Sequence, residues 1–318
     1  MTRRRFKTAL ALSGGSARAL AHLGILQELQ DSNIQIDMIV GTSMGAILGG
    51  LYASYGDAEI VIQKMRELLA SELFLQTVAI ASEDVPSALP DSFLHRFVWL
   101  FRRGIYYTHS MTRPTLVAEE TYAQIMTDLI PDCDIEELKI PFAAVTVDIL
   151  TGEEVVLTTG SLRKAVSASA ALPGILPAVE LNGRSLVDGG WVDNVPVAPA
   201  IALGAHFVIA ADASWDLRDM GPLPTTAIEN LFRCNQITRV TLDHHRRSFA
   251  DVLLIPRLGT FYWADFQDMD RCLPAGRNVT KKNLDYIKRK RRHRKYRSIW
   301  GRIHPARSTD WLHPFVVL

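Results

Sequence analysis

A serine between two glycines, at residues 41–45, is the residue best suited to covalent chemistry in this 318-residue chain. An apolar stretch leads into Gly41-Thr-Ser43-Met-Gly45, and a run of small and apolar residues follows it. This order predicts a strand that turns sharply into a helix, with the serine hydroxyl raised clear of the backbone. Glycines fit the flanking positions because a Cβ there would collide across the turn. Ser43 is therefore a candidate nucleophile, supported by Gly41 and Gly45.

A second glycine-rich segment, Ser13-Gly14-Gly15-Ser16, follows a predicted strand and opens a predicted helix. Unpaired N–H groups at a helix start can hold an anion, either a nucleotide phosphate or the oxyanion of an acyl-transfer intermediate. Phosphate is the weaker interpretation, because the loop has neither a Gly-Lys-Ser/Thr ending nor three spaced glycines. A simple tight turn is the purely structural alternative. The serine at position 43 favours the oxyanion hole.

A serine nucleophile requires a base, and none of the nine histidines stands in a motif of that kind. The strongest acidic candidate is Asp188, in Leu186-Val-Asp188-Gly189-Gly190. An aspartate at the carboxyl end of a strand lies where the active sites of parallel sheets assemble. The structural alternative is an Asp-Gly turn.

The elements that must position these residues alternate between strands and helices. Strands are predicted at residues 8–13, 37–40, 141–147, 154–157, 185–187, 206–211 and 252–256, and helices after residues 16 and 43 and at 58–69, 115–129, 161–169 and 228–249. This βαβ order predicts a largely parallel sheet. With no internal repeat or low-complexity linker, we expect one domain over residues 7–287, followed by a basic C-terminal extension over residues 288–318.

Charge is unevenly distributed behind a net value of +1. Residues 281–302 hold eleven of the 35 Lys and Arg, with Asp285 as their sole acidic residue. Such a run is either a solvated extension or a contact for anionic lipid or nucleic acid. Nucleic acid is disfavoured, because only Tyr296 and Trp300 supply the aromatic interleaving that such binding uses. We therefore expect peripheral contact with an anionic membrane through Lys281–Arg302.

The remaining composition, 48% hydrophobic and 22% charged, is that of a globular protein. Three widely spaced cysteines predict a reducing compartment without disulfides. No apolar run reaches the length of a membrane span, so a cytoplasmic location with contact to a membrane surface is expected. Residues 92–103, with aromatic side chains between basic ones, predict either an interfacial helix or a buried one.

Three ordered blocks resemble the signature blocks of the patatin-like phospholipases: residues 13–19, 41–45 and 187–190. Residues 146–153 and 165–177 resemble the stretches that precede the third block, and the similarity extends over residues 7–287, as in bacterial members. The resemblance implies a three-layer α/β/α fold with a central, mostly parallel sheet. It also implies hydrolysis of fatty-acyl esters without a cofactor or a metal.

Carried over by position, the resemblance implies a catalytic dyad in which Ser43 is the nucleophile and Asp188 the base. Gly189 and Gly190 are expected to support the aspartate. Asp188 would accept the Ser43 proton as the hydroxyl attacks the ester carbonyl, and an acyl-enzyme would follow.

The same resemblance implies an oxyanion hole formed by the backbone of Gly14, Gly15 and Ser16. Arg18 matches the basic residue of the family, expected to fix this loop or to add positive potential near the oxyanion. Ser16 and Ala19 stand where the family has glycines. A positive φ at position 16 would be less favourable for serine than for glycine.

The sequence thus predicts a serine acyl hydrolase whose substrate is a phospholipid, a lysophospholipid or another acyl ester. A non-catalytic lipid-binding or adaptor protein on the same fold is the alternative. The joint presence of Ser43, Asp188 and the Gly14-Gly15 pair argues against it, since a protein without catalysis would not need all of them. The lipid head group, the acyl position and the oligomeric state stay open.

Overall fold

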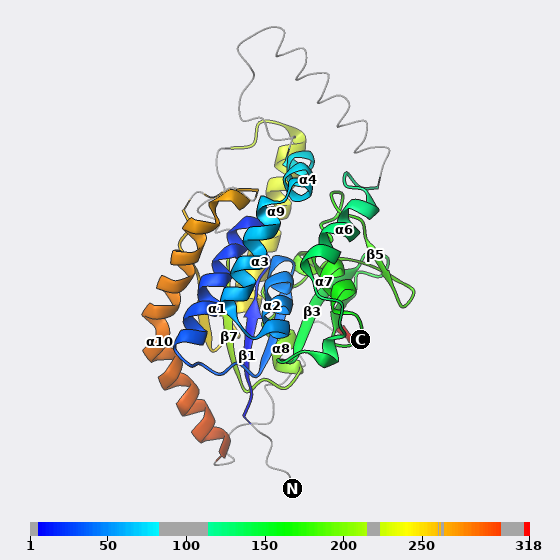
Figure 1. Cartoon of the computed structure of the whole chain (residues 1–318). Coiled ribbons are helices and arrows are strands. Elements are labelled where there is room, and N and C mark those ends of the chain that lie inside the picture. The colour runs from blue at the N-terminus through cyan, green and yellow to red at the C-terminus, as the bar shows by residue number, and fades with distance from the viewer. Residues whose placement is uncertain (1–5, 83–113, 215–222, 260, 262–263, 300–314) are drawn as a thin grey trace, which may run out of the picture.

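The computed structural model describes residues 6–82, 114–214, 223–259, 261, 264–299 and 315–318 (Figure 1). Residues 92–103, for which the sequence predicts an interfacial or buried helix, lie outside this part of the chain. So do residues 300–302 at the end of the basic run.

Strands and helices alternate along the chain, as predicted. The strands are β1 (Thr8–Leu12), β2 (Met38–Thr42), β3 (Phe142–Asp148), β4 (Glu154–Leu157), β5 (Val179–Leu181), β6 (Arg184–Asp188), β7 (Phe207–Ala211), β8 (Val252–Leu254) and β9 (Phe315–Val317). The α-helices are α1 (Ala21–Asp31), α2 (Met44–Tyr55), α3 (Ala58–Ala70), α4 (Glu72–Ser82), α6 (Glu119–Leu129), α7 (Leu162–Ala170), α8 (Val197–Ala202), α9 (Ala227–Arg247) and α10 (Met269–Ile299). The 3₁₀ helices are η1 (Ser16–Leu20), η2 (Ile135–Glu137), η3 (Gly189–Trp191) and η5 (Phe266–Asp268). In the described ranges no helix is long and apolar enough to cross a lipid bilayer.

Nine strands of the described chain form one sheet, in the order β5-β6-β3-β2-β1-β7-β8, with β4 beside β3 and β9 beside β4. The strands β3, β2, β1, β7 and β8 run parallel to one another. Strands β4 and β6 pair antiparallel with β3, and β5 pairs antiparallel with β6. The predicted mostly parallel sheet is confirmed, with antiparallel strands added on one side.

Alternate side chains of the strands pack into two separate hydrophobic clusters. Leu10 and Ile39 belong to a cluster with residues of α1, α2, α3, α7 and α10. Ala9 and Val40 belong to a second cluster, which includes Val197 and other residues of α8. Because successive side chains of a strand point to opposite faces, helices cover both sides of the sheet. This is the predicted three-layer α/β/α architecture.

The basic run continues α10 without a break across residue 288, where the sequence predicts the start of an extension. Lys290 Nζ donates to the Asp251 carbonyl oxygen at 2.7 Å, and Arg294 Nε donates to Asp251 Oδ1 at 2.9 Å. Arg291 Nε donates to Thr8 Oγ1 at 2.8 Å. Thr8 begins β1 and Asp251 precedes β8, so these contacts lie where the parallel strands begin.

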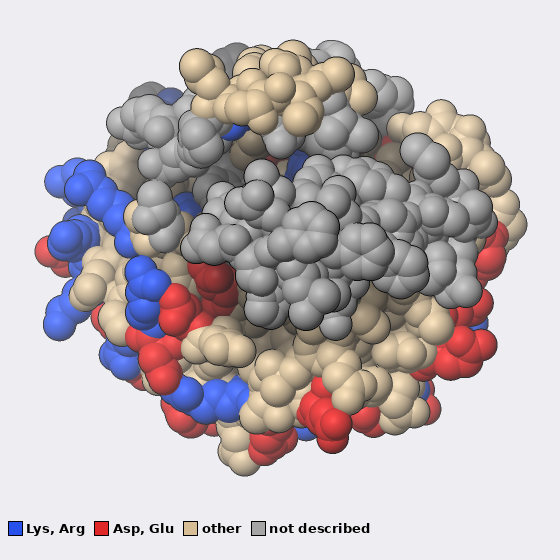
Figure 2. All heavy atoms as spheres, turned by 90° about the horizontal axis from the view of Figure 1, so that it is seen from above, with Lys and Arg blue, Asp and Glu red and all other residues tan. Residues whose placement is uncertain are grey.

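Seen from above, Lys and Arg gather on the side of the molecule that α10 occupies in Figure 1 (Figure 2). On α10, the side chains of Lys288, Arg289, Arg292 and Lys295 are exposed. Strand β9, also within the predicted extension, pairs parallel with β4. Part of residues 288–318 is therefore built into the sheet and onto its flank.

Candidate active site

Ser43 lies at the turn between β2 and α2, with φ 56° and ψ −127°. A residue with a Cβ adopts this region only when the surrounding structure imposes it. The two flanking glycines allow the close packing that does so. A Cβ on Gly41 would lie 2.4 Å from the Gly45 carbonyl oxygen, and one on Gly45 would lie 2.3 Å from the Leu12 carbonyl oxygen. Both positions thus exclude any larger residue.

The backbone of Ser43 is tied to the neighbouring strand by a side chain that the sequence analysis missed. The Ser43 N–H donates to Ser169 Oγ at 2.9 Å, and the Ser169 hydroxyl donates to the Val145 carbonyl oxygen at 2.6 Å. Ser169 lies in the predicted helix of residues 161–169 and in the family-like stretch 165–177, but neither pattern singles out this serine. Its role follows from its hydrogen bonds in the folded chain.

Strand register brings Asp188 beside Ser43. Thr42 pairs with Val145 of β3, and the next residue of β3, Thr146, pairs with Asp188. Strand β6 is antiparallel to β3, whereas the sequence interpretation assumed the carboxyl end of a parallel strand. Asp188 still reaches the site, because β3 extends beyond the end of β2. Strand β6 pairs with this extension of β3, so the end of β6 lies directly beyond the end of β2.

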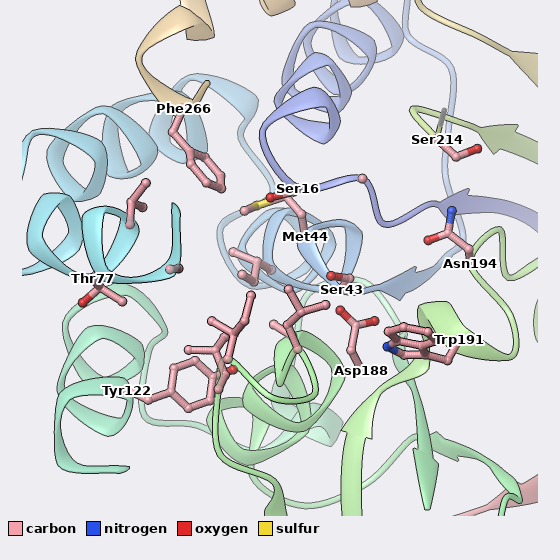
Figure 3. Close-up of a pocket in the computed structure, with 18 of the residues that line it drawn as sticks. Ser16, Ser43, Met44, Thr77, Tyr122, Asp188, Trp191, Asn194, Ser214 and Phe266 are labelled. Atoms are coloured by element: carbon pink, nitrogen blue, oxygen red, sulfur yellow. The ribbon is translucent and has the colours of Figure 1, made fainter. Parts of the chain in front are cut away.

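The Asp188 carboxylate is 4% exposed and hydrogen-bonded to the Ser43 hydroxyl. The two side chains face each other in Figure 3. Its Oδ1 also accepts the Gly190 N–H at 2.7 Å. Burial raises the pKa of Asp188, and the hydrogen bonds from Ser43 and Gly190 and the positive charge of Arg239 offset part of that rise. The site therefore holds a carboxylate that is more basic than an exposed aspartate.

The glycine-rich loop contributes two free amides close to this pair. The Gly14 N–H donates to the Asn194 carbonyl oxygen at 3.2 Å, so that amide is occupied. No acceptor within the described residues faces the N–H of Gly15 or Ser16, and both residues line the same cavity as Ser43. The φ angles of Gly15 and Ser16 are 142° and 51°. Of the predicted oxyanion residues, these two have donors to offer.

The positive φ of Ser16 leads to a stability prediction. We expect Ser16→Gly to raise the free energy of unfolding by about 1 kcal/mol, because glycine adopts this conformation without a Cβ penalty. Activity should stay within about twofold, because the donor is the backbone N–H. Urea denaturation and ester hydrolysis measure the two quantities. Asn33→Gly, at φ 54° on an exposed residue, is the matched control. A tenfold loss of activity in Ser16→Gly would mean that the hydroxyl itself is used.

Arg18 is buried beneath the loop and fixes it. Its Nε donates to the Ala213 carbonyl oxygen at 3.1 Å, and its Nη1 donates to the Gly259 carbonyl oxygen at 3.2 Å. These bonds tie the loop to the segment after β7 and to residue 259. Of the two roles expected for Arg18, the geometry favours fixing the loop.

A cavity of about 480 Å³ opens at the Ser43–Asp188 pair. One side is apolar and is formed by side chains from α3, α4 and α6 together with the residues after α7, among them Leu68, Phe74, Val78, Met126 and Leu176. The other side is polar. In Figure 3, Asn194 and Ser214 lie on one side of Ser43, and Tyr122, Thr77 and Phe266 on the other. Ser43 thus stands at the junction of an apolar arm and a polar arm.

Histidine plays no part in this cavity, since none lines it in the described chain. His22, the histidine nearest in sequence to the glycine loop, is completely buried, and its Nε2 lies 2.9 Å from the Ser13 carbonyl oxygen. Burial lowers the pKa of His22 to about 4, so this side chain is neutral at pH 7. Asp188 is the acidic group that contacts the Ser43 hydroxyl.

The polar arm contains residues that the sequence analysis did not single out for the site: Trp191, Arg239 and Asp243. Asp243 is buried and accepts a hydrogen bond from Asn194 Nδ2 at 3.4 Å. Burial, followed by the negative charge of Asp212, raises the pKa of Asp243 to about 7. Arg239 and Asp243 come from one face of α9, four residues apart. That spacing is common on solvated helices, so it gave no signal for a site.

A mostly parallel sheet between two layers of helices, with a serine at a strand-to-helix turn above its carboxyl edge, defines a three-layer α/β/α protein of the serine-elbow kind. The family model of the patatin-like phospholipases matches residues 10–201. That match spans more than half of the chain, and the chain belongs to this family.

Relatives of known sequence agree with this assignment. An uncharacterised NTE family protein of Mycobacterium bovis is 32% identical over 243 residues, which cover 74% of this chain and 58% of that protein. The lysophospholipase NTE1 of Mycosarcoma maydis is 32% identical over 64% of this chain and 9% of its own length. Patatin-like phospholipase domain-containing protein 6 of Mus musculus is also 32% identical over 64% of this chain, and 13% of its own length is matched. The chain thus spans little more than half of the first relative and a small part of the others.

A solved structure with a similar fold is that of human GIVD cytosolic phospholipase A2, with a TM-score of 0.51 and 12% identity. The alignment covers 91% of this chain and 60% of that one. At this identity the likeness concerns the fold alone.

Proposed function

We propose that this protein is a serine acyl hydrolase that cleaves fatty-acyl esters of phospholipids or lysophospholipids. The observation that carries the proposal is the hydrogen bond between Ser43 and the buried Asp188 at the junction of an apolar and a polar cavity arm. An acyl chain fits the apolar arm, and the ester carbonyl then lies beside the Ser43 hydroxyl.

In the first half of the proposed reaction, the Ser43 proton moves to Asp188 as Ser43 Oγ bonds to the carbonyl carbon. The negative charge that develops on the carbonyl oxygen is met by the N–H groups of Gly15 and Ser16, each such donor contributing about 3 kcal/mol. The alcohol leaves as its C–O bond breaks, and it takes the proton from Asp188. Water then attacks the acyl-enzyme with Asp188 again as base, which releases the fatty acid and restores Ser43.

Family membership supports a phospholipid or lysophospholipid as the substrate. One relative is named a lysophospholipase and another a phospholipase domain protein. The proposed peripheral contact with anionic membranes through residues 281–302 is separate from this site. The hydrogen-bonded cations of α10 lie where the strands begin, whereas Ser43 follows the end of β2.

Covalent labelling tests the proposal directly. The full chain is treated with a fluorophosphonate probe, and the modified peptide is located by mass spectrometry. In parallel, products from 1-oleoyl lysophosphatidylcholine and dioleoyl phosphatidylcholine are analysed. We expect one adduct, on Ser43, and release of oleic acid from at least one lipid. Peptide mapping matters because Ser16 and Ser214 also line the cavity.

Two results would count against the assignment. An adduct on Ser16 or Ser214 would identify that serine, and not Ser43, as the nucleophile. The absence of both labelling and fatty-acid release would favour the alternative, a non-catalytic lipid-binding or adaptor protein on the same fold.

A further inference from the structure

The polar arm of the cavity has no task in the proposed ester hydrolysis. It is lined by Trp191, Asn194, Asn235, Gln236, Arg239 and Asp243, which come from the segment after β6 and from α9. Apart from the Trp191 ring and Val240, an acyl chain would meet charged and amide side chains there. Since Ser43 stands between the two arms, the part of the substrate on the alcohol side of the ester must enter the polar one.

Arg239 is a charged group in this arm with a buried donor available to a ligand. Its buried Nε has no hydrogen-bond partner, and no carboxylate in the described chain lies within ion-pairing distance of its guanidinium. The guanidinium carbon lies 4.6 Å from the centre of the Trp191 ring, in a cation–π contact that fixes its plane. A buried donor left without an acceptor is costly, so a ligand that supplies one is favoured.

The guanidinium also lies close to the reacting pair. A Cβ placed on Gly190 would be 3.0 Å from Asp188 Oδ1 and 3.5 Å from Arg239 Nη2. Burial raises the pKa of both Asp188 and Asp243, and the positive charge of Arg239 offsets part of each rise. An anion bound to Arg239 would thus lie near an ester attacked by Ser43, close enough for both groups to belong to one substrate molecule. In a glycerophospholipid, the phosphate is separated from the acyl ester by no more than the glycerol carbons.

Two carboxyl groups face the same space and restrict which anion can bind. Asp188 is hydrogen-bonded to Ser43 and the Gly190 amide, and Asp243 is partly protonated near neutral pH. A phosphodiester carries one negative charge spread over two oxygens, which matches the planar fork of an arginine. The side-chain amides of Asn235 and Gln236 add neutral donors.

We propose that Arg239, held by Trp191, is the subsite for the phosphate of the substrate's head group. Resting on the proposed function, this inference narrows the substrate class. The enzyme prefers acyl esters that carry a phosphate next to the glycerol over neutral glycerides.

The test compares two substrates with one acyl chain. In 1-oleoyl lysophosphatidylglycerol the phosphate is the only charged group, and 1-oleoylglycerol has none. The full chain is assayed as wild type, Arg239→Gln, Arg239→Lys and Arg233→Gln. Arg233 lies on the same helix, six residues earlier, and does not line the cavity. Circular dichroism checks that each variant is folded.

We expect the ratio of kcat/KM for the phosphate ester to that for the neutral ester to fall about tenfold or more in Arg239→Gln. Arg239→Lys should fall between this variant and wild type, because it keeps the charge and loses the fork. Arg233→Gln should keep the wild-type ratio. An equal loss on both substrates in Arg239→Gln would overturn the inference, because Arg239 would then act only through Asp188.

Inhibition of 1-oleoylglycerol hydrolysis separates the sources of phosphate. Glycerophosphoglycerol is expected to inhibit the wild type at lower concentration than inorganic phosphate does. Equal inhibition by the two would indicate a free-phosphate site and would overturn the head-group assignment. If the wild type hydrolyses neither ester and Ser43 is not labelled, the proposed function fails and this inference with it. If the wild type is active but Arg239→Gln keeps the wild-type ratio, the phosphate subsite is refuted and the proposed function stands.

Discussion

Ser43→Ala is expected to lower kcat/KM for acyl esters by about 10⁴-fold or more, because the attacking oxygen is lost and the acyl-enzyme on Ser43 cannot form. The free energy of unfolding should change by less than about 1 kcal/mol, since alanine keeps the Cβ and the same backbone conformation. Hydrolysis of a lysophospholipid and urea denaturation measure the two effects.

Ser43→Gly provides the matched control for this first prediction. It should be equally inactive, yet more stable than wild type by about 1 kcal/mol, because glycine accepts φ 56° and ψ −127° without a Cβ penalty. Comparing Ser43→Ala with Ser43→Gly separates the loss of activity from the effect of backbone strain on the free energy of unfolding. Residual activity above a tenth of wild type in Ser43→Ala would point to another nucleophile, with Ser16 and Ser214 the ones lining the cavity.

The second large effect is expected for Asp188→Asn, which should lower kcat by about 10²- to 10⁴-fold, the range that a general base contributes. Asparagine can still accept the Gly190 N–H, so the turn is retained. In the wild type, activity requires ionised Asp188 and is lost as pH falls through its pKa. Burial raises that pKa, so the acid limb of the pH–rate profile should lie above the ordinary aspartate value of 3.8.

The same substitution should alter stability with a defined dependence on pH. Because the folded-state pKa of Asp188 is raised, the native protein holds this proton more tightly than the unfolded chain does. The wild type therefore loses stability as pH rises from the unfolded value through the raised native one. Asp188→Asn should match the wild type below about pH 3.8 and be the more stable protein at pH 7.

Denaturation midpoints measured from pH 3 to 8 check this second prediction. A variant less stable than the wild type at pH 7 would contradict it. Asp243 lines the same cavity and titrates near 7, so Asp243→Asn serves as the control that separates its contribution to the pH–rate profile from that of Asp188.

Sequence alone determined the local parts of this protein. The turn at Ser43 requires glycine at position 41 because a Cβ there would meet the Gly45 carbonyl oxygen, only four residues along the chain. Glycine at position 45 is required by a tertiary contact instead, with the Leu12 carbonyl oxygen of β1. The alternation of apolar runs and helical patterns predicted the layered sheet, because a strand–helix–strand order favours parallel strands covered by helices. The three family-like blocks indicated the fold and the two residues of the proposed dyad.

Tertiary structure decided how these parts meet. Asp188 lies beside Ser43 through the register of β2, β3 and an antiparallel β6, which no local pattern specifies. The Gly14 amide is occupied by a carbonyl from Asn194, and α9 brings Arg239 into the cavity. These contacts join residues distant in sequence. Their geometry depends on how the whole sheet and its helices pack, because register and side-chain placement are set by the packed core.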